Sequence, residues 1–229
     1  KRIFLTYCRD VTGSRQYRQE FLNLISDRGL AEQCQIQSFD LPPVGPDASA
    51  VYNHNDFNNT AISVVLETVF DARIHLTEKI LRPIACGHPF ILAAGPGSLH
   101  VLRNYGFRTF AGYINESYDE ITDNNKRLAA IVQEMHRIQA LSDQQRSSLI
   151  DSCRQIADYN RKHFFSKKFF DQVCDELVHN VSAAKNATAD QLDFTIWLQE
   201  RDWRQRTGSP TCQSLKDPYA EYILRQISQ

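Results

Sequence analysis

The sequence contains no apolar run of the length that a membrane span needs. Its longest apolar runs, such as Pro89 to Ala94, are far shorter than the roughly 18 to 20 residues required. It also has no excess of one charge, since 26 Lys and Arg stand against 27 Asp and Glu. Such a balance provides no overall field for nucleic acid or an anionic membrane. We therefore predict no nucleic-acid partner and no membrane span, and we expect any charged ligand to be recognised at a local site.

Cysteine patterns that bind zinc or form redox centres are missing. The six cysteines include no CxxC pair and no Cys/His cluster at zinc spacing. We expect them to be reduced and mostly buried thiols, and we predict no metal site. No signal peptide precedes the four N-x-[ST] triplets of the chain, so we expect a cytoplasmic protein.

The sequence contains enough hydrophobic residues for a packed core. The 229 residues are 42% hydrophobic and 10% aromatic, which is near the globular average. In the first half, strand-like apolar runs at 3–7, 35–39, 61–66 and 89–93 are interspersed with helical patterns. Strands that are hydrophobic rather than half-polar favour a parallel sheet covered by helices on both faces. We therefore predict an α/β fold for residues 1–122.

The second half has a different pattern. From Asp123 onward, apolar residues recur at helical spacing, so we predict a mainly helical region over residues 123–229 that packs on the first domain. Its aromatic residues, including Phe165 and Phe170, are expected in core or inter-helix contacts. We also predict a surface loop at 41–59, a break at 207–214 and a terminal helix at 218–227, all from their composition. No internal repeat is present.

Ligands of open α/β sheets bind beyond the carboxyl ends of the strands. The first strand is followed by a Gly/Ser/Thr loop flanked by Arg9 and Arg15, in which Ser14 can cap a helix that Gly29 can end. Amides, hydroxyls and a guanidinium at a helix start are typical of a phosphate cradle, although a solvated surface loop is the alternative. The spacing matches neither GxGxxG nor the Walker lysine loop, which disfavours a dinucleotide dehydrogenase and a P-loop NTPase.

The third strand also ends in residues that suit a ligand. Glu67 stands at its carboxyl end, and Thr77 can cap a helix whose first turn contains Glu78 and Lys79. A lysine in the first turn opposes the helix dipole unless an anion binds there. Glu78 is an acceptor suited to the vicinal hydroxyls of a ribose. The alternative is a Glu/Lys pair on a solvated helix end.

The fourth strand is followed by two glycines. Gly95 and Gly97 permit close approach of a ligand or of the chain itself, and a plain strand-to-helix turn is the alternative. His75 is interpreted as structural rather than catalytic from its local pattern. No Asp-x-Asp motif is present to hold a metal–diphosphate complex, so neutralisation of a phosphate is assigned to Arg15 and Lys79.

The set of motifs resembles the nucleotide-sugar-binding half of GT-B glycosyltransferases, most closely the α-1,3-fucosyltransferase-like group. That family has S/G-R-x-x-Y opening a helix, which G-S-R-Q-Y at residues 13–17 resembles. It also has F-E-N followed by Y-V-T-E-K, which L-E-T at 66–68 and H-L-T-E-K at 75–79 resemble. The chain is also similar to uncharacterised bacterial and phage sequences with G-F-x-T-F and E-S-Y-D blocks, as at 106–110 and 116–119. The likeness covers about residues 1 to 125, and it implies a bacterial or phage-infected cell as the source.

The resemblance implies a Rossmann-like sheet, half of a GT-B fold, that binds a nucleotide sugar in residues 1–122. It assigns Arg15 and Lys79 to the diphosphate, Glu78 to the ribose hydroxyls, and Glu67 to the donor sugar or nucleotide. The implied donor-binding set is Arg15, Tyr17, Glu67, His75, Thr77, Glu78 and Lys79. Of these, Lys79, Arg15 and Glu67 are the expected catalytic residues.

The function expected from this resemblance is metal-independent, inverting glycosyl transfer. The donor is a nucleoside diphosphate sugar, with a GDP-linked sugar as one candidate, and the acceptor is a glycan or another hydroxyl compound. No cofactor is expected besides the donor. The family takes its base from an N-terminal acceptor domain, which we expect to precede Lys1; otherwise Asp10, Glu67 or Glu116 would serve. The alternative is a non-catalytic Rossmann-like binding or scaffold module.

Overall fold

The computed structural model describes residues 2–37 and 52–188, which fall into two compact units, Lys1–Ser166 and Lys167–Gln229. The first unit contains a four-stranded parallel sheet of order β2-β1-β3-β4. This confirms the predicted α/β fold with a parallel, Rossmann-like sheet. The strands are β1 (Phe4–Tyr7), β2 (Cys34–Gln37), β3 (Ile62–Leu66) and β4 (Phe90–Ala93).

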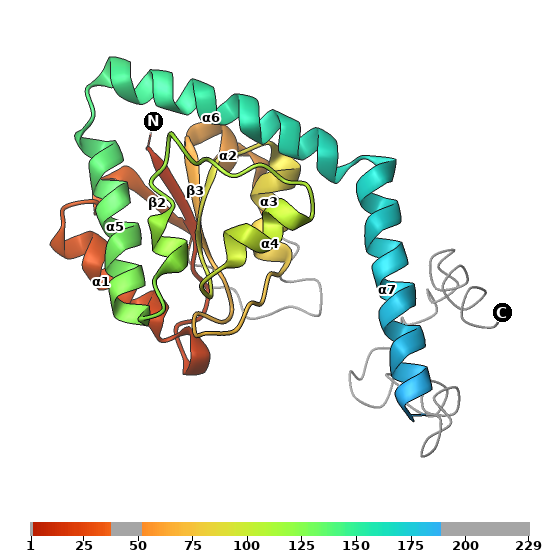
Figure 1. Ribbon diagram of the computed structural model, residues 1–229. Helices are drawn as coiled ribbons and strands as arrows, with labels where there is room; N and C mark the ends of the chain where they lie inside the picture. Colours follow the sequence, from red (N-terminus) through yellow and green to blue (C-terminus); the bar gives the residue numbers. More distant parts are fainter. Residues whose placement is uncertain (1, 38–51, 189–229) are drawn as a thin grey trace. The chain divides into compact units, whose positions relative to one another are not determined.

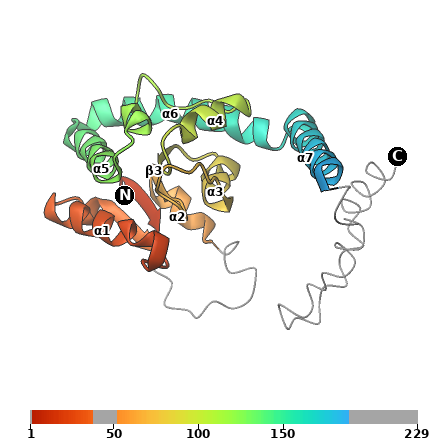
Figure 2. The same ribbon diagram turned by 60° about the horizontal axis from the view of Figure 1, so that its bottom comes forward.

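Helices cover both faces of this sheet, which is why β3 and β4 are buried along their whole length. Figures 1 and 2 show α1 and α5 on one face and α2 and α3 on the other. The helices of this unit are α1 (Tyr17–Asp27), α2 (His54–Asn59), α3 (Glu78–Cys86), α4 (Ser98–Asn104), α5 (Asn124–Ala140) and α6 (Asp143–Phe164). Short 3-10 turns are η1 (Gly13–Arg15), η2 (Ala31–Gln33) and η4 (Ser117–Glu120).

Helix α6 packs near the amino ends of the strands. Gly87, which ends α3 at φ 64°, lies against Arg161, and Gly106 lies against the imidazole of His163. The Nε2 atom of that imidazole is 2.7 Å from the carbonyl oxygen of Tyr105. Both glycines adopt positive φ and leave room for α6, so a side chain at either position would meet strain and crowding.

Local signals explain where several helices begin. Asp123 accepts a hydrogen bond from the amide of Lys126 and caps α5, and Ser142 and Gln145 form a capping box at α6. Ser14 does not cap α1 as predicted. It lies inside the η1 turn, and its hydroxyl donates to the carbonyl of Thr68 instead. Gly29, at φ 65°, follows the end of α1 as expected.

The predicted loop at 41–59 is wrong over its last part, because His54–Asn59 form α2. Asn53 caps this helix, and its buried residues Asp56 and Phe57 anchor it. Residues 41–51 of that loop, the break at 207–214 and the helix at 218–227 lie outside the described residues.

The helical second half is confirmed through Thr188, but the compact units divide after Ser166 and not at residue 122. The reason is that α5 and α6 pack with the sheet and its helices. In the second unit, α7 spans Lys167–Thr188. Phe165 and Phe170 are 67% and 50% exposed, so neither belongs to the core, the first of the two places expected for them.

The structure also bears on the predictions for the cysteines and for membrane spans, within residues 2–37 and 52–188. Among the cysteines described there, those at 8, 34, 86 and 153 form no disulfide, and those at 8, 34, 153 and 174 are buried. No helix among these residues combines the length and apolar character of a membrane span.

Candidate functional site

The loops after β1 and β3 meet at the point where the strand order reverses. The chain passes from β1 to β2 on one side and returns to β3 on the other. In open α/β sheets this reversal creates the crevice in which ligands bind. The two loops are in contact, because the Ser14 hydroxyl lies 3.4 Å from the carbonyl oxygen of Thr68.

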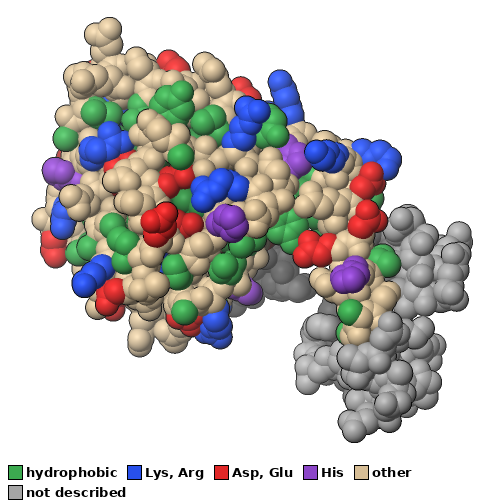
Figure 3. Space-filling view, in the orientation of Figure 1, with side chains coloured by type: hydrophobic (Ala, Val, Ile, Leu, Met, Phe, Trp, Pro, Cys, Tyr) green, Lys and Arg blue, Asp and Glu red, His purple; other side chains and the backbone are tan. Residues whose placement is uncertain are grey.

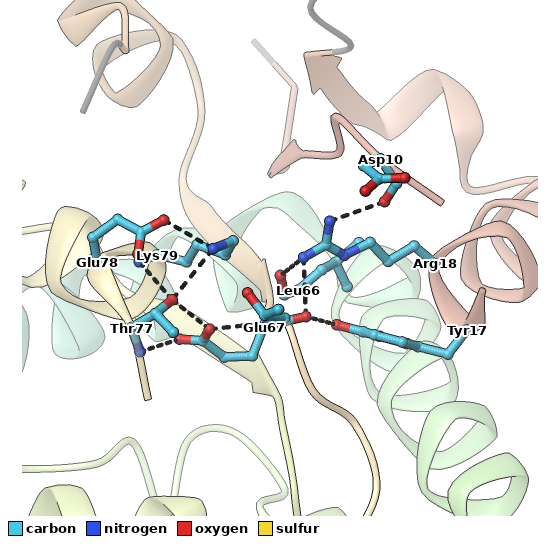
Figure 4. Close-up of polar contacts among 9 residues, drawn as sticks. Asp10, Tyr17, Arg18, Leu66, Glu67, Thr77, Glu78 and Lys79 are labelled. Atoms are coloured by element: carbon cyan, nitrogen blue, oxygen red, sulfur yellow. Dashed lines mark hydrogen bonds and ion pairs between the residues drawn. The ribbon is translucent and has the colours of Figure 1, made fainter. Parts of the chain in front are cut away.

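Glu67, at the end of β3, is fully buried and holds the next helix in place (Figure 4). Its Oε1 accepts from the amide of Thr77 at 3.0 Å, and its Oε2 accepts from the Thr77 hydroxyl at 2.6 Å. Oε2 also accepts from the amide of Thr68 at 3.2 Å. The structure thus directs Glu67 to Thr77, and not to a surface where a donor would touch it.

Thr77 links Glu67 to Lys79. Its hydroxyl caps α3 by accepting from the Lys79 amide at 3.3 Å, which confirms the predicted cap. The same oxygen lies 3.4 Å from the Lys79 Nζ, which also donates to Glu78 at 2.8 Å. Burial alone would raise the pKa of Glu78, but its hydrogen bond with Lys79 keeps it below its ordinary value. The ammonium of Lys79 therefore lies at the start of α3 beside one carboxylate.

The loop after β1 is organised by Asp10. Its Oδ1 accepts from the amide and hydroxyl of Thr12, and its Oδ2 pairs with Arg15 at 2.9 Å. The hydrogen bonds from Thr12, followed by the charge of Arg15, lower the pKa of Asp10. Arg15 ends the η1 turn, in which Gly13 has φ 57°. The guanidinium of Arg15 is thus held near the surface, with its side chain 36% exposed.

The first turn of α1 clamps the carboxyl ends of β1 and β3 together. The buried Tyr17 donates its hydroxyl to the Glu67 carbonyl at 2.5 Å. Arg18, only 3% exposed, donates to the carbonyls of Leu66 and Glu67, at 2.9 and 3.0 Å, and to the carbonyl of Asp10. Burial raises the pKa of Tyr17, so its hydroxyl stays neutral. Tyr17 therefore stabilises the end of β3 from the buried side of the site.

Arg18 is a residue of this site that the sequence motifs do not single out. The available signal was its position three residues before Phe21 and seven before Ile25, which places it on the buried face of α1. A guanidinium on an apolar face needs acceptors, and here strand carbonyls supply them.

Arg127 performs a similar task at the end of β4. It is 1% exposed and donates to the carbonyls of Phe70 and Ala94, while its guanidinium lies 4.2 Å from the Phe70 ring centroid. The Phe70 ring also stacks on the ring of Tyr17, with their centroids 4.3 Å apart. The loop that follows β3 is thereby fixed between α1 and α5.

Gly95 permits close approach of the chain, one of the two possibilities that its pattern left open. A Cβ at this position would overlap the carbonyl of Arg73. The loop before α3 therefore packs directly on the end of β4. His75 is exposed in that loop, and no contact within the described residues joins its side chain to the Glu67, Thr77 and Lys79 group.

Glu116, considered as a base, lines a different pocket, of about 420 Å³, together with Asp119 and Arg103. It accepts from the amide of Phe110 at 2.5 Å. Burial raises the pKa of Glu116 and of Asp119. The carboxylate of Asp119 accepts a hydrogen bond from the amide of Leu99 at the start of α4.

Within the part of the chain that the structure describes, no three His, Cys, Asp or Glu side chains lie close enough to hold a metal ion. The chain matches no protein-family model, no curated protein and no solved structure.

Proposed function

We propose that the chain is the donor-binding domain of a metal-independent glycosyltransferase that uses a nucleoside diphosphate sugar. One observation carries the proposal. The hydrogen-bonded series Glu67, Thr77, Lys79 places an ammonium at the start of α3, at the strand reversal beside the loop that contains Arg15.

This arrangement suits a diphosphate. The amino end of α3 contributes the positive end of its dipole, and full charges come from Lys79 in the first turn of α3 and from Arg15 in the loop after β1. Glu78 is 42% exposed, and its lowered pKa keeps it an acceptor suited to ribose hydroxyls. On ligand binding, Lys79 would exchange Glu78 for a phosphate oxygen.

In the proposed reaction, an acceptor hydroxyl attacks the anomeric carbon of the sugar. The bond from that carbon to the phosphate oxygen breaks, and the diphosphate leaves with the electron pair. Lys79 and Arg15 stabilise the charge that develops on the leaving group. The proton of the hydroxyl passes to a general base.

The carboxylates considered as this base are all committed elsewhere. Asp10 pairs with Arg15, Glu67 is fully buried, and Glu116 is hydrogen-bonded in a separate pocket. We therefore propose that the base comes from another segment or another chain. The same observation favours the second candidate function, a nucleotide-binding module that performs no transfer.

A donor-turnover assay separates the two candidates. The protein is incubated with GDP-, UDP-, CDP- and ADP-linked sugars, with and without glycan acceptors, and free nucleoside diphosphate is quantified. Transferase activity predicts release that depends on acceptor and falls in Lys79→Ala. Binding without any release favours the module, and an absence of binding contradicts both.

A further inference from the structure

The pocket lined by Glu116 lies between α4 and the segment 111–120, which includes the η4 turn. Leu99 and Arg103 line it from α4, the helix that follows the edge strand β4, and residues of the segment line its other side. Its volume is about 420 Å³. Ligand pockets in proteins measure roughly 300 to 1,000 Å³, so this pocket is large enough for a small organic molecule.

Contacts with two helices hold this segment in place. The backbone amide of Asn115 donates to the carboxylate of Glu134, on α5, at 2.9 Å. The carboxylate of Asp119 accepts from the amide of Leu99 at 3.1 Å, and the Asp119 carbonyl accepts from the amide of Gly97 at 2.8 Å. The wall of the pocket is therefore formed before a ligand binds, which reduces the entropy that binding costs.

Three of the four charged side chains that line the pocket already have hydrogen-bond partners, and Asp119 is one of them. Arg103 donates to Glu116 at 3.5 Å and to the Thr109 hydroxyl at 3.0 Å. The side chain of Glu116 is only 10% exposed, and it also accepts from the amide of Phe110. Figure 3 shows a similar mixture of signs, with basic and acidic groups interspersed over the face in view. The pocket therefore does not select its ligand by an unpaired buried charge.

The remaining polar groups of the pocket are a mixture of donors and acceptors. Within the described part of the chain, nothing is hydrogen-bonded to the Ser117 hydroxyl, to the side-chain nitrogen of Asn115 or to the Glu120 carboxylate. A hydroxyl group both donates and accepts, so the several hydroxyls of a sugar ring match such a mixture. Ala111 and Ile114 add apolar surface for the C–H groups of the ring.

We infer that this pocket binds a saccharide. One sugar ring lies between α4 and the segment 111–120, where its hydroxyls donate to the Glu120 carboxylate and accept from the Asn115 side-chain amide. The Ser117 hydroxyl pairs with a further hydroxyl of the ring. The inference goes beyond the proposed function and does not rest on it, because no residue of the proposed donor site lines this pocket.

Backbone-amide NMR of the protein tests for this site. Methyl glycosides of glucose, galactose, mannose, fucose and N-acetylglucosamine are titrated to tens of millimolar, and at least one should shift the signals of Asn115 and Ser117. Glu120→Ala removes an acceptor and should weaken binding of that glycoside at least about threefold. Glu32→Ala is the matched control, because Glu32 is exposed in η2, which precedes the opposite edge strand, β2.

Four results would each overturn the inference. The first is that no glycoside binds, and the second is that binding leaves the signals of Asn115 and Ser117 unchanged. The third is unchanged affinity in Glu120→Ala. The fourth is that spermidine, a polyamine without hydroxyls, binds here more tightly than every glycoside, since charge would then select the ligand. If Glu120→Ala does not fold, Ser117→Ala decides by the same threefold loss. Binding of nucleoside diphosphates is measured separately, so the failure of either proposal is distinguishable.

Discussion

The carboxylate of Glu67 accepts both the amide and the hydroxyl of Thr77, at 3.0 and 2.6 Å. This contact joins the end of β3 to the first turn of α3 across a loop of nine residues, 68–76. Because Thr77 in turn contacts Lys79, a buried carboxylate determines where a half-buried cation lies. Glu67 is thus a positioning residue in the proposed site, acting through Thr77.

Replacing this carboxylate tests that role. Glu67→Gln puts an NH2 group opposite protein donors, so we expect it to lower the free energy of unfolding by about 1–3 kcal/mol. Nucleoside diphosphate affinity should fall as well, since Lys79 loses its support. Urea denaturation and calorimetry measure the two effects, with Thr77→Ser as the control because it keeps both donors. Unchanged affinity in a folded Glu67→Gln variant would show that Lys79 is positioned without Glu67.

Lys79 should matter for binding and not for folding. Its side chain is 27% exposed, and its ion pair with Glu78 is a surface contact of the kind that adds little to stability. We expect Lys79→Ala to weaken diphosphate binding about tenfold while its melting temperature stays close to that of the unchanged protein. Lys162→Ala, an exposed change on α6, is the control. A large loss of melting temperature in Lys79→Ala would make the residue structural.

Gly95 should tolerate no side chain. Gly95→Ala places a Cβ on the Arg73 carbonyl, and overpacking of this kind costs about 1–3 kcal/mol. Gly29→Ala has positive φ but open space, so its cost should stay near 1–2 kcal/mol. Denaturant midpoints compare the two. A Gly95→Ala protein as stable as the unchanged chain would show that the loop before α3 moves freely.

The buried carboxyl group of Glu116 should make the free energy of unfolding depend on pH. Burial raises its pKa in the folded state, so the folded state holds the proton more tightly than the unfolded state. The stability that this provides is present below the ordinary pKa, about 4.3, and is lost as pH rises through the folded value. Glu116→Gln should therefore gain stability relative to the unchanged protein near pH 8 and lose that advantage near pH 3.

Thermal unfolding across this pH range provides the measurement. Glu120→Gln is the matched control, because Glu120 lines the same pocket and is exposed. A Glu116→Gln advantage that does not change with pH would contradict the assignment to a buried carboxylate.

Much of the fold was predictable because its signals are local. Continuous apolar runs such as 61–66 indicate buried parallel strands, and Thr77 before Glu78 and Lys79 indicates a helix start. The short helix at His54–Asn59 was missed, since its polar residues are weak helix formers and its stability comes from Asn53 and the buried Phe57. Tertiary contacts of this kind leave little trace in local sequence.

The site was predictable in part. The grouping of Glu67 with Thr77 and Lys79 follows from their places at a strand end and a helix start. The burial of Glu67 and the pairing of Arg15 with Asp10 do not, because both depend on how two separate loops meet.

The central claim is that the strand reversal binds a nucleoside diphosphate. Its most direct test is a thermal-shift panel of GDP, UDP, CDP and ADP against the unchanged protein and Lys79→Ala. A ligand that binds only the folded state raises apparent stability by mass action. We predict a concentration-dependent rise with one diphosphate that is reduced in Lys79→Ala. Equal melting temperatures with and without every diphosphate at millimolar concentration would contradict the claim.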